Sequence, residues 1–422
     1  MVKKLTLPNG LRIILIPQSS APAATVLILV EAGSEYETKN INGLSHFLEH
    51  MTFKGTTNRP KPGMVSRELD GLGAQSNAFT GQEYTGYWAK VQSHKVDKIL
   101  DIVSDLYLNP IFNQAEIDKE RGVVIEEINL YEDTPPRRVQ ELFNSLLYGD
   151  QPAGWDIGGR KEVIRKVSRN DFVKYRSTHY VASKTIVVVA GGFNEKKVLA
   201  QIKKDFKSLP RARRVAKFAT RVPHQKRPAV LLKHKESDQS HLVLGSHAFD
   251  VFDSRRYALD VLNDVLGGGM SSRLFQRVRE ELGAAYYIRS GADLMLDHGY
   301  FEVSSGVDHT KIDQVIRAIV EELRKLTQVL VGKEELQKAK DHLTGNLLLS
   351  LEGSDDLANF YGGQEILTRN LETPEHMIQK LQKVSADEIR RLARAIFKPE
   401  TLNLAIIGPY KKVTNFTKLL KF

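Results

Sequence analysis

The chain has no cysteine among its 422 residues, which excludes disulfide bonds and thiol catalysis. A Gly-x-Ser-x-Gly motif is also absent, so nothing in the sequence supports a serine hydrolase. The glycine cluster at residues 267–269 is not followed by Gly-Lys-Ser or Gly-Lys-Thr. We therefore reject a nucleotide phosphate loop there.

Long hydrophobic runs are missing as well. The apolar stretch of residues 21–30 is too short to span a membrane and has the composition of a strand. The first ten residues lack the apolar core of a signal peptide, and no nucleic-acid-binding module is recognisable. We expect a soluble, cytoplasmic protein that binds neither nucleic acid nor membranes.

The net charge of +10 comes almost entirely from one segment. Residues 203–227 contain ten Lys or Arg and one acidic residue, Asp205, so this segment alone contributes 10 − 1 = +9. Two prolines interrupt it. This pattern predicts a solvated, charged linker between two domains rather than an arm that binds nucleic acid.

The most informative stretch reads His-Phe-Leu-Glu-His at residues 46–50. On a helix, with Asn42 as its predicted N-cap, His46 and His50 lie on one face at the spacing that two ligands of one metal ion need. Glu49 projects beside them and can act on water instead of binding the metal. The alternative is a half-buried amphipathic helix with incidental histidines.

A third protein ligand would complete such a site, and without cysteine it must be His, Asp or Glu. The expected donor is a helical pattern at residues 114–129. Glu120 and Glu127 are seven positions apart and share a helical face. Glu126 is rotated by about 100° from Glu127 around the helix axis, so we expect its carboxylate to be solvated. Spacing alone does not choose firmly between Glu126 and Glu127.

With Glu127 at 127 − 50 = 77 positions after the second histidine, the pattern resembles the pitrilysin, insulinase and mitochondrial processing peptidase family of zinc peptidases. The resemblance implies that His46, His50 and Glu127 bind one Zn²⁺ per chain. It further implies that Glu49 is the general base and that Glu120 supports the site. Manganese or cobalt stays open as an alternative metal.

Residues 76–85 resemble the family's active-site edge strand, where a peptide substrate is bound as an added strand. The resemblance implies substrate binding by Asn77, Ala78 and Phe79. Without it, the stretch is only an alternating strand and a weak signal.

An arginine and a tyrosine seven residues apart, Arg279 and Tyr286, resemble a pair that reaches the family's active site from the C-terminal domain. The resemblance implies that they bind the substrate backbone and that Tyr286 stabilises the oxyanion. The alternative is a surface arginine and a packing tyrosine.

The two halves of the chain form an internal repeat. Residues 43–55 align with residues 257–269 at an offset of 269 − 55 = 214, and residues around 116 align with those around 335 at an offset of 219. The positions opposite the motif and the third ligand are Asp260, Asn263, Asp264 and Asn346. We therefore predict a duplicated domain whose second copy lacks the metal ligands.

The predicted fold class is α+β, with two homologous α/β-sandwich domains joined by the basic linker. Each domain would hold a mixed, largely antiparallel sheet packed with helices. The predicted limits are 1–208 for the zinc-binding domain, 209–227 for the linker and 228–422 for the second domain.

These features predict a zinc-dependent endopeptidase that hydrolyses peptides or unfolded segments. The resemblance implies that two-domain chains pair to enclose a chamber, as a homodimer or as a heterodimer with a paralogous chain. One alternative is a non-catalytic structural or assembly subunit related to inactive family members. Another is a metal-dependent hydrolase that acts on something other than peptides.

Overall fold

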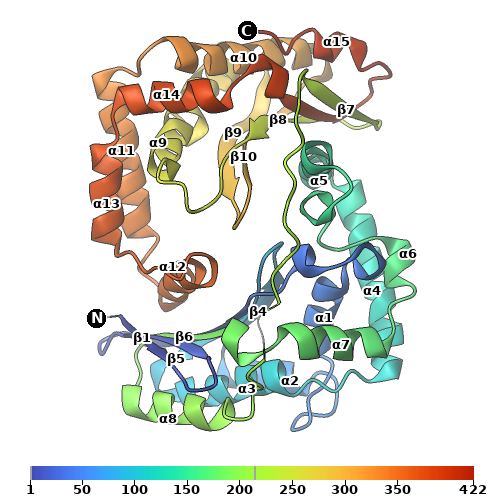
Figure 1. Ribbon diagram of the computed structural model, residues 1–422, viewed down its shortest axis with the longest axis vertical. Coiled ribbons are helices and arrows are strands. Elements are labelled where there is room, and N and C mark those ends of the chain that lie inside the picture. Colours follow the sequence, from blue (N-terminus) through green and yellow to red (C-terminus); the bar gives the residue numbers. More distant parts are fainter. Residues whose placement is uncertain (1, 213–214) are drawn as a thin grey trace. The chain divides into compact units, whose positions relative to one another are not determined.

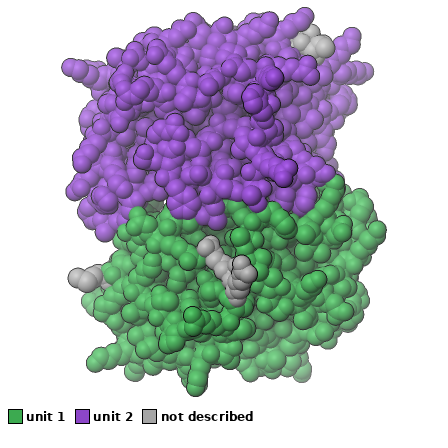
Figure 2. All heavy atoms as spheres, in the orientation of Figure 1, with its two compact units in different colours: residues 1–129, 156–218, 349–371 green, residues 130–155, 219–348, 372–422 purple. Residues whose placement is uncertain are grey.

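The structure is a computed structural model that describes residues 2–212 and 215–422. It contains two compact units, which Figure 2 distinguishes by colour. Unit 1 comprises Met1–Asn129, Asp156–Phe218 and Leu349–Leu371, and unit 2 comprises Leu130–Trp155, Ala219–Leu348 and Glu372–Phe422. Each unit is built on one sheet covered by helices, which confirms the predicted α+β fold class.

The sheet of unit 1 has six strands in the order β1-β2-β6-β3-β5-β4. Only β2 and β6 run parallel, so the sheet is mixed and largely antiparallel, as predicted. The strands are β1 (Lys3–Thr6), β2 (Arg12–Pro17), β3 (Ala23–Val30), β4 (Gln75–Thr80), β5 (Thr85–Gln92) and β6 (Thr185–Gly191).

One face of this sheet packs on helices from the first half of the chain. The helices are α1 (Leu44–Thr52), α2 (Met64–Leu72), α3 (Val96–Leu108), α4 (Gln114–Asp133), α6 (Lys161–Ile164), α7 (Arg169–His179) and α8 (Glu195–Asp205). Strand β6 is buried along its whole length and reads as a continuous apolar run instead of an alternating one. Such a run occurs where both faces of a sheet are covered.

The other face is covered by α12 (Ser354–Leu367), which comes from the C-terminal half of the chain (Figure 1). Its residues Leu357, Ala358 and Tyr361 pack with Ile14 and Leu27 of the sheet. Unit 1 therefore cannot bury its sheet without a segment that lies far away in the sequence.

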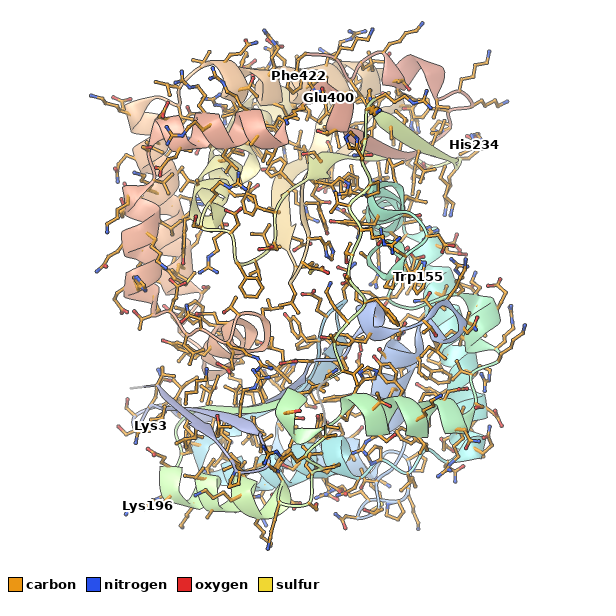
Figure 3. All side chains as sticks on the ribbon, in the orientation of Figure 1. Lys3, Trp155, Lys196, His234, Glu400 and Phe422 are labelled. Carbon is orange, nitrogen blue, oxygen red and sulfur yellow. The ribbon has the colours of Figure 1, made fainter. Side chains whose placement is uncertain are left out.

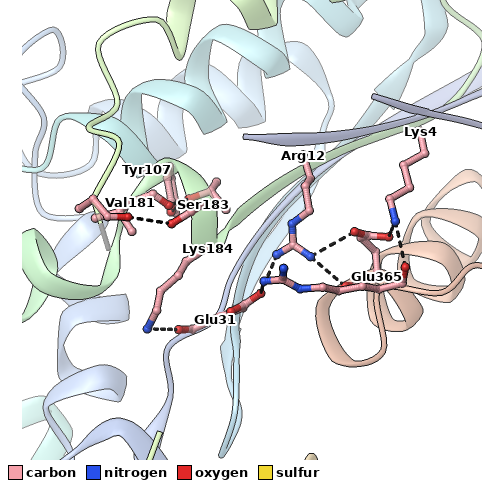
Figure 4. A network of polar contacts seen from close by, with 11 residues as sticks. Lys4, Arg12, Glu31, Tyr107, Val181, Ser183, Lys184 and Glu365 are labelled. Carbon is pink, nitrogen blue, oxygen red and sulfur yellow. Dashed lines mark hydrogen bonds and ion pairs between the residues drawn. The ribbon is translucent and has the colours of Figure 1, made fainter. Parts of the chain in front are cut away.

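Buried ion pairs fix α12 and its following turn on unit 1 (Figure 4). Arg12 donates to Glu31 at 2.7 Å and to Glu365 of α12 at 3.1 Å. The Glu365 side chain is fully buried and also binds Lys4 at 2.7 Å, while Arg369 binds Glu31 at 2.9 Å. A buried charge is costly unless it is paired, so these pairs specify where α12 docks.

Unit 2 repeats this plan with a five-stranded sheet in the order β7-β11-β8-β10-β9, in which only β7 and β11 are parallel. Its strands are β7 (Ala229–His234), β8 (Ser240–His247), β9 (Ala285–Leu294), β10 (Gly299–Val307) and β11 (Asn403–Gly408). The helices on one face are α9 (Arg256–Gly267), α10 (Ile312–Gln328), α11 (Lys333–Leu349), α13 (Pro374–Lys383) and α14 (Ala386–Ile396). A short helix, α15 (Thr414–Thr417), lies near the C-terminus.

The opposite face of this second sheet is covered by α5 (Pro135–Tyr148), a helix of the N-terminal half. Helix α5 follows α4, and α12 follows α11, so corresponding helices of the two halves are exchanged between the units. The compact units therefore differ from the predicted ranges 1–208 and 228–422 at these two helices. Each helix has an apolar face, and the pattern of that face does not reveal which sheet it covers.

The prediction that residues 203–227 are wholly solvated is wrong at Lys217. The Lys217 side chain is 7% exposed and forms ion pairs with Glu35 and, at 3.0 Å, with Glu83. Other basic residues of this segment are exposed, such as Lys207, Arg211 and Lys226. Exposed lysines also occur elsewhere in the chain, such as Lys3 and Lys196, which are labelled in Figure 3. No helix within residues 2–212 and 215–422 combines the length and the apolar character needed to cross a bilayer.

Candidate metal centre

The histidine motif lies on α1, but the prediction that Asn42 caps this helix is wrong. The N-cap is Gly43, with φ 95°, and a Cβ there would lie 2.5 Å from the Gly158 carbonyl oxygen. The cap is supplied by the buried Glu37 carboxylate, which accepts from the N–H groups of Gly43 (2.7 Å) and Ser45 (2.6 Å). Burial raises the pKa of Glu37 to about 7, although these hydrogen bonds oppose the rise.

The structure brings His46, His50 and Glu127 together. The Nε2 atoms of His46 and His50 are 3.3 Å apart, and Glu127 Oε2 lies 3.6 Å from the first and 3.3 Å from the second. Two ligands about 2.1 Å from a tetrahedral zinc ion are roughly 3.4 Å apart. The three donor atoms therefore fit a zinc ion without rearrangement.

Glu120, one of the predicted site residues, contacts the Nδ1 side of the His50 ring. Its Oε1 atom lies 3.0 Å from His50 Nδ1, and its Oε2 atom binds Lys54 at 2.6 Å. This contact holds Nε2 of His50 toward Glu127, as a carboxylate does for many metal-binding histidines. Burial would raise the pKa of Glu120, but His50 and Lys54 lower it below its usual range.

The Glu120 and Glu127 carboxylates also change the pKa of His50. Burial lowers the pKa of His50, but the hydrogen bonds to Glu120 and Glu127 outweigh burial and raise it to about 9. A metal ligand must be neutral at the coordinating nitrogen, so a metal would compete with a proton for this ring.

Glu49 lies beside these three side chains but contacts a different partner. Its Oε2 atom accepts a hydrogen bond of 2.5 Å from the Thr80 hydroxyl. Burial raises the pKa of Glu49, and the bond from Thr80 opposes this rise. Glu126 is exposed, so the structure places it in solvent and Glu127 at the site.

The predicted substrate strand is shorter than expected. Residues 76–85 do not form one strand, because β4 ends at Thr80 and the chain turns back into β5. Strand β4 is an edge of the sheet. Asn77 is exposed and its Oδ1 atom accepts from the Ala78 N–H at 2.9 Å, while Phe79 packs toward the cluster under α12.

Arg279 and Tyr286 lie in unit 2, whereas the three metal-binding candidates lie in unit 1. Arg279 is on a π-helical segment, η6 (Phe275–Glu281), with its guanidinium 5.1 Å from the centre of the Phe275 ring. Tyr286 is on β9 and is 73% exposed, whereas Tyr287 is half-buried and its ring stacks on that of His241. A role for Arg279 and Tyr286 in the site stays a prediction.

The second unit has a different set of polar residues on the helices that correspond to α1 and α4. Asp264 of α9 contacts Nδ1 of His342 at 2.7 Å, and Asn346 of α11 contacts Nε2 of the same ring at 3.1 Å. Among the described residues, α9 and α11 supply no group of three side chains that could hold a metal.

Three supporting residues were not singled out from the sequence, namely Glu37, which caps α1, Lys54, which contacts Glu120, and Thr80, which contacts Glu49. Strand alternation could have indicated Thr80, because Ala78 and Thr80 share one face of β4. For Glu37 and Lys54 the sequence gives no such signal, since their contacts depend on how loops fold around α1.

Comparisons with known proteins agree with this geometry. Residues 12–160 match the family model described as Insulinase (Peptidase family M16), and residues 166–343 match the model described as Peptidase M16 inactive domain. An uncharacterized zinc protease of Bacillus subtilis is 34% identical over 409 residues, which cover 97% of this chain and 98% of that protein. One from Streptomyces coelicolor is 32% identical over 415 residues, covering 97% and 90%.

Solved structures show the same fold. A protease from Helicobacter pylori superimposes with a TM-score of 0.91 at 26% identity, covering 97% of this chain and 99% of that chain. A peptidase M16 inactive domain from Pseudomonas fluorescens gives a TM-score of 0.88 at 18% identity, covering 97% and 98%. The family matches and the long alignments with proteins named zinc proteases agree with the histidine motif, and this chain belongs to the insulinase family of peptidases, family M16.

Proposed function

We propose that this protein is a zinc-dependent endopeptidase that hydrolyses peptides or unfolded segments. The observation that carries the proposal is the set of distances, 3.3, 3.6 and 3.3 Å, among the donor atoms of His46, His50 and Glu127. A fourth side chain beside them has a carboxylate that is not one of these donors. That carboxylate is Glu49.

His46, His50 and Glu127 would hold one zinc ion per chain. Zinc bound there supplies Lewis acidity, which polarises a carbonyl group and lowers the pKa of water. Glu49 takes the proton from the attacking water and delivers it to the leaving amine. Burial raises the pKa of Glu49, which is the direction that makes a carboxylate a better base. Glu120 keeps the His50 ring oriented through Nδ1.

The substrate would add to the edge of β4 as an extended strand, with Asn77, Ala78 and Phe79 as its nearest contacts. Main-chain hydrogen bonds give little sequence preference, which suits a broad range of peptides. The side chain of Asn77 occupies the Ala78 N–H, so an incoming strand would displace it.

Arg279 and Tyr286 would bind the substrate backbone, and the exposed Tyr286 hydroxyl would donate to the developing oxyanion. This chain carries both the histidine motif and this pair. That favours a homodimer that encloses a chamber, with a paralogous chain as the alternative partner.

The test measures cleavage of a quenched, unstructured peptide by wild type, by Glu49→Gln and by wild type with a chelator, and determines the zinc content of each. We expect activity in the untreated wild type alone, with about one zinc per chain retained by Glu49→Gln. An active Glu49→Gln variant would refute the proposed base. Bound zinc without cleavage of any peptide would favour a non-catalytic subunit. A folded protein without stoichiometric zinc would contradict the whole proposal.

A further inference from the structure

Thr80 connects the edge strand to Glu49. Residues alternate between the two faces of a strand, and Ala78 packs in the core on the same side of the sheet as α1. Thr80 is two positions further on, so its side chain also points toward α1. Its hydroxyl donates to Glu49 Oε2 at 2.5 Å, the distance of a strong hydrogen bond to a carboxylate.

The turn that follows Thr80 is held in place by backbone hydrogen bonds. The Gly81 N–H donates to the Tyr84 carbonyl at 2.8 Å, which closes the turn. From outside the hairpin, Ser34 N–H donates to the Gly81 carbonyl at 3.2 Å and Glu35 N–H to the Gln82 carbonyl at 2.8 Å. Because the backbone around Thr80 is held in this way, the Thr80 hydroxyl is already positioned to donate to Glu49. The hydrogen bond therefore costs little conformational freedom.

Glu83, which follows Gln82 in this turn, is held by an ion pair. The carboxylate of Glu83 is almost completely buried and binds Lys217 of the basic segment at 3.0 Å. The end of β4 is therefore tied at several points, and Thr80 has a defined position relative to α1.

We propose that Thr80 is a positioning residue for Glu49, and that it selects the carboxylate orientation in which the free Oε1 atom takes the proton from water. The inference rests on the proposed function, since Glu49 must be the base. It also assigns β4 a second role. The strand that receives the substrate also orients the base, so peptide addition at this edge and proton transfer share one residue.

The test compares Thr80→Val, which keeps the shape but lacks the donor, with Thr80→Ser, which keeps the donor. We expect Thr80→Val to lower kcat about 10- to 100-fold, a part of what a general base contributes, while KM changes by less than about threefold. Thr80→Ser should restore most of kcat. Both variants should bind zinc and a non-cleavable peptide like the wild type. Thr178→Val removes a comparable hydroxyl, which donates to the Lys174 carbonyl on α7, and should behave like the wild type.

Crystal structures of the zinc-loaded Thr80→Val and Thr80→Ser proteins provide a readout that does not depend on activity. We expect Glu49 to leave its present orientation in the valine variant only. An unchanged kcat, an unchanged Glu49 rotamer, or loss of zinc in Thr80→Val would each overturn the inference. If the wild type cleaves no peptide, the proposed function fails, and the Glu49 rotamer still decides whether Thr80 positions that side chain.

Discussion

Glu126 and Glu127 are adjacent on α4 but have different surroundings. Glu127 faces both histidines of the motif, whereas Glu126 is exposed to solvent. The rotation of about 100° between neighbouring helical residues produces this difference, and it makes Glu126 a control of identical chemistry.

Glu127→Gln should weaken zinc binding by more than about 100-fold, because losing even an outer hydrogen-bond partner of a metal ligand costs roughly 10- to 100-fold. Glu126→Gln should bind zinc like the wild type. The measurement is competition with a chromophoric chelator at pH 7.5. Equal affinity of the two variants would mean that Glu127 is not a ligand.

The proximity of His46, His50 and Glu127 in the candidate metal centre was largely predictable, because two histidines four positions apart share a helical face, as do Glu120 and Glu127 seven positions apart. The residues that support these side chains could not be predicted. Lys54 and Glu37 act through contacts that arise only when the chain has folded around α1. The Asn42 prediction was wrong for the same reason, since the Glu37 carboxylate from the preceding loop accepts from the first N–H groups of α1.

At the scale of elements, α5 packs on the sheet of unit 2 through an apolar stripe and also makes polar contacts. Gln140 of α5 donates to Glu302 of β10 at 2.9 Å. Burial raises the pKa of Glu302 to about 7, and the bond from Gln140 only partly offsets this rise. The folded protein therefore holds this proton more tightly than the unfolded chain does.

Because the pKa of Glu302 is higher in the folded protein than in the unfolded chain, protonated Glu302 favours the folded state. This contribution is fully present below about pH 4.5 and is lost as the pH rises through about 7. Glu302→Gln removes the charge and keeps the acceptor for Gln140. We expect the variant to match the wild type near pH 5 and to be more stable at pH 8 by on the order of 1–3 kcal/mol. Urea unfolding at both pH values measures this difference.

Glu334→Gln, at an exposed position of α11, is the control and should show no gain in stability at pH 8. A Glu302→Gln protein that is no more stable than the wild type at pH 8 would contradict the argument.

Many elements were predictable from the sequence, and their partners were not. The helix at residues 114–129 appears as α4, and the apolar stretch of residues 21–30, which has the composition of a strand, contains β3. The docking of α12 could not be predicted, because it depends on ion pairs such as that between Arg12 and Glu365, which are 353 positions apart. Local periodicity carries no information about contacts of that range.

For the whole molecule, the exchange of α5 and α12 means that neither half of the sequence contains all of its own unit. A fragment of residues 1–227 would lack α12 and expose the apolar sheet residues Ile14, Leu27, Leu29 and Val188. An exposed apolar surface of this kind promotes aggregation.

We expect the fragment 1–227 to be insoluble or to bind a hydrophobic dye. Appending residues 349–371 to it, or producing it together with residues 228–422, should yield soluble protein. Solubility, dye binding and a cooperative thermal transition are the measurements. Cooperative folding of 1–227 alone would show that α12 is dispensable for unit 1.

The position of α12 in the sequence also sets an order of events during synthesis. Residues 1–218 leave the ribosome about 150 residues before α12 is complete, and at 5–20 residues per second that interval lasts roughly 8–30 s. During this time one face of the first sheet has no native cover, and the buried Arg12 lacks Glu365, the partner that α12 brings. We therefore expect the nascent chain to bind chaperones that recognise apolar strands until α12 has covered this face.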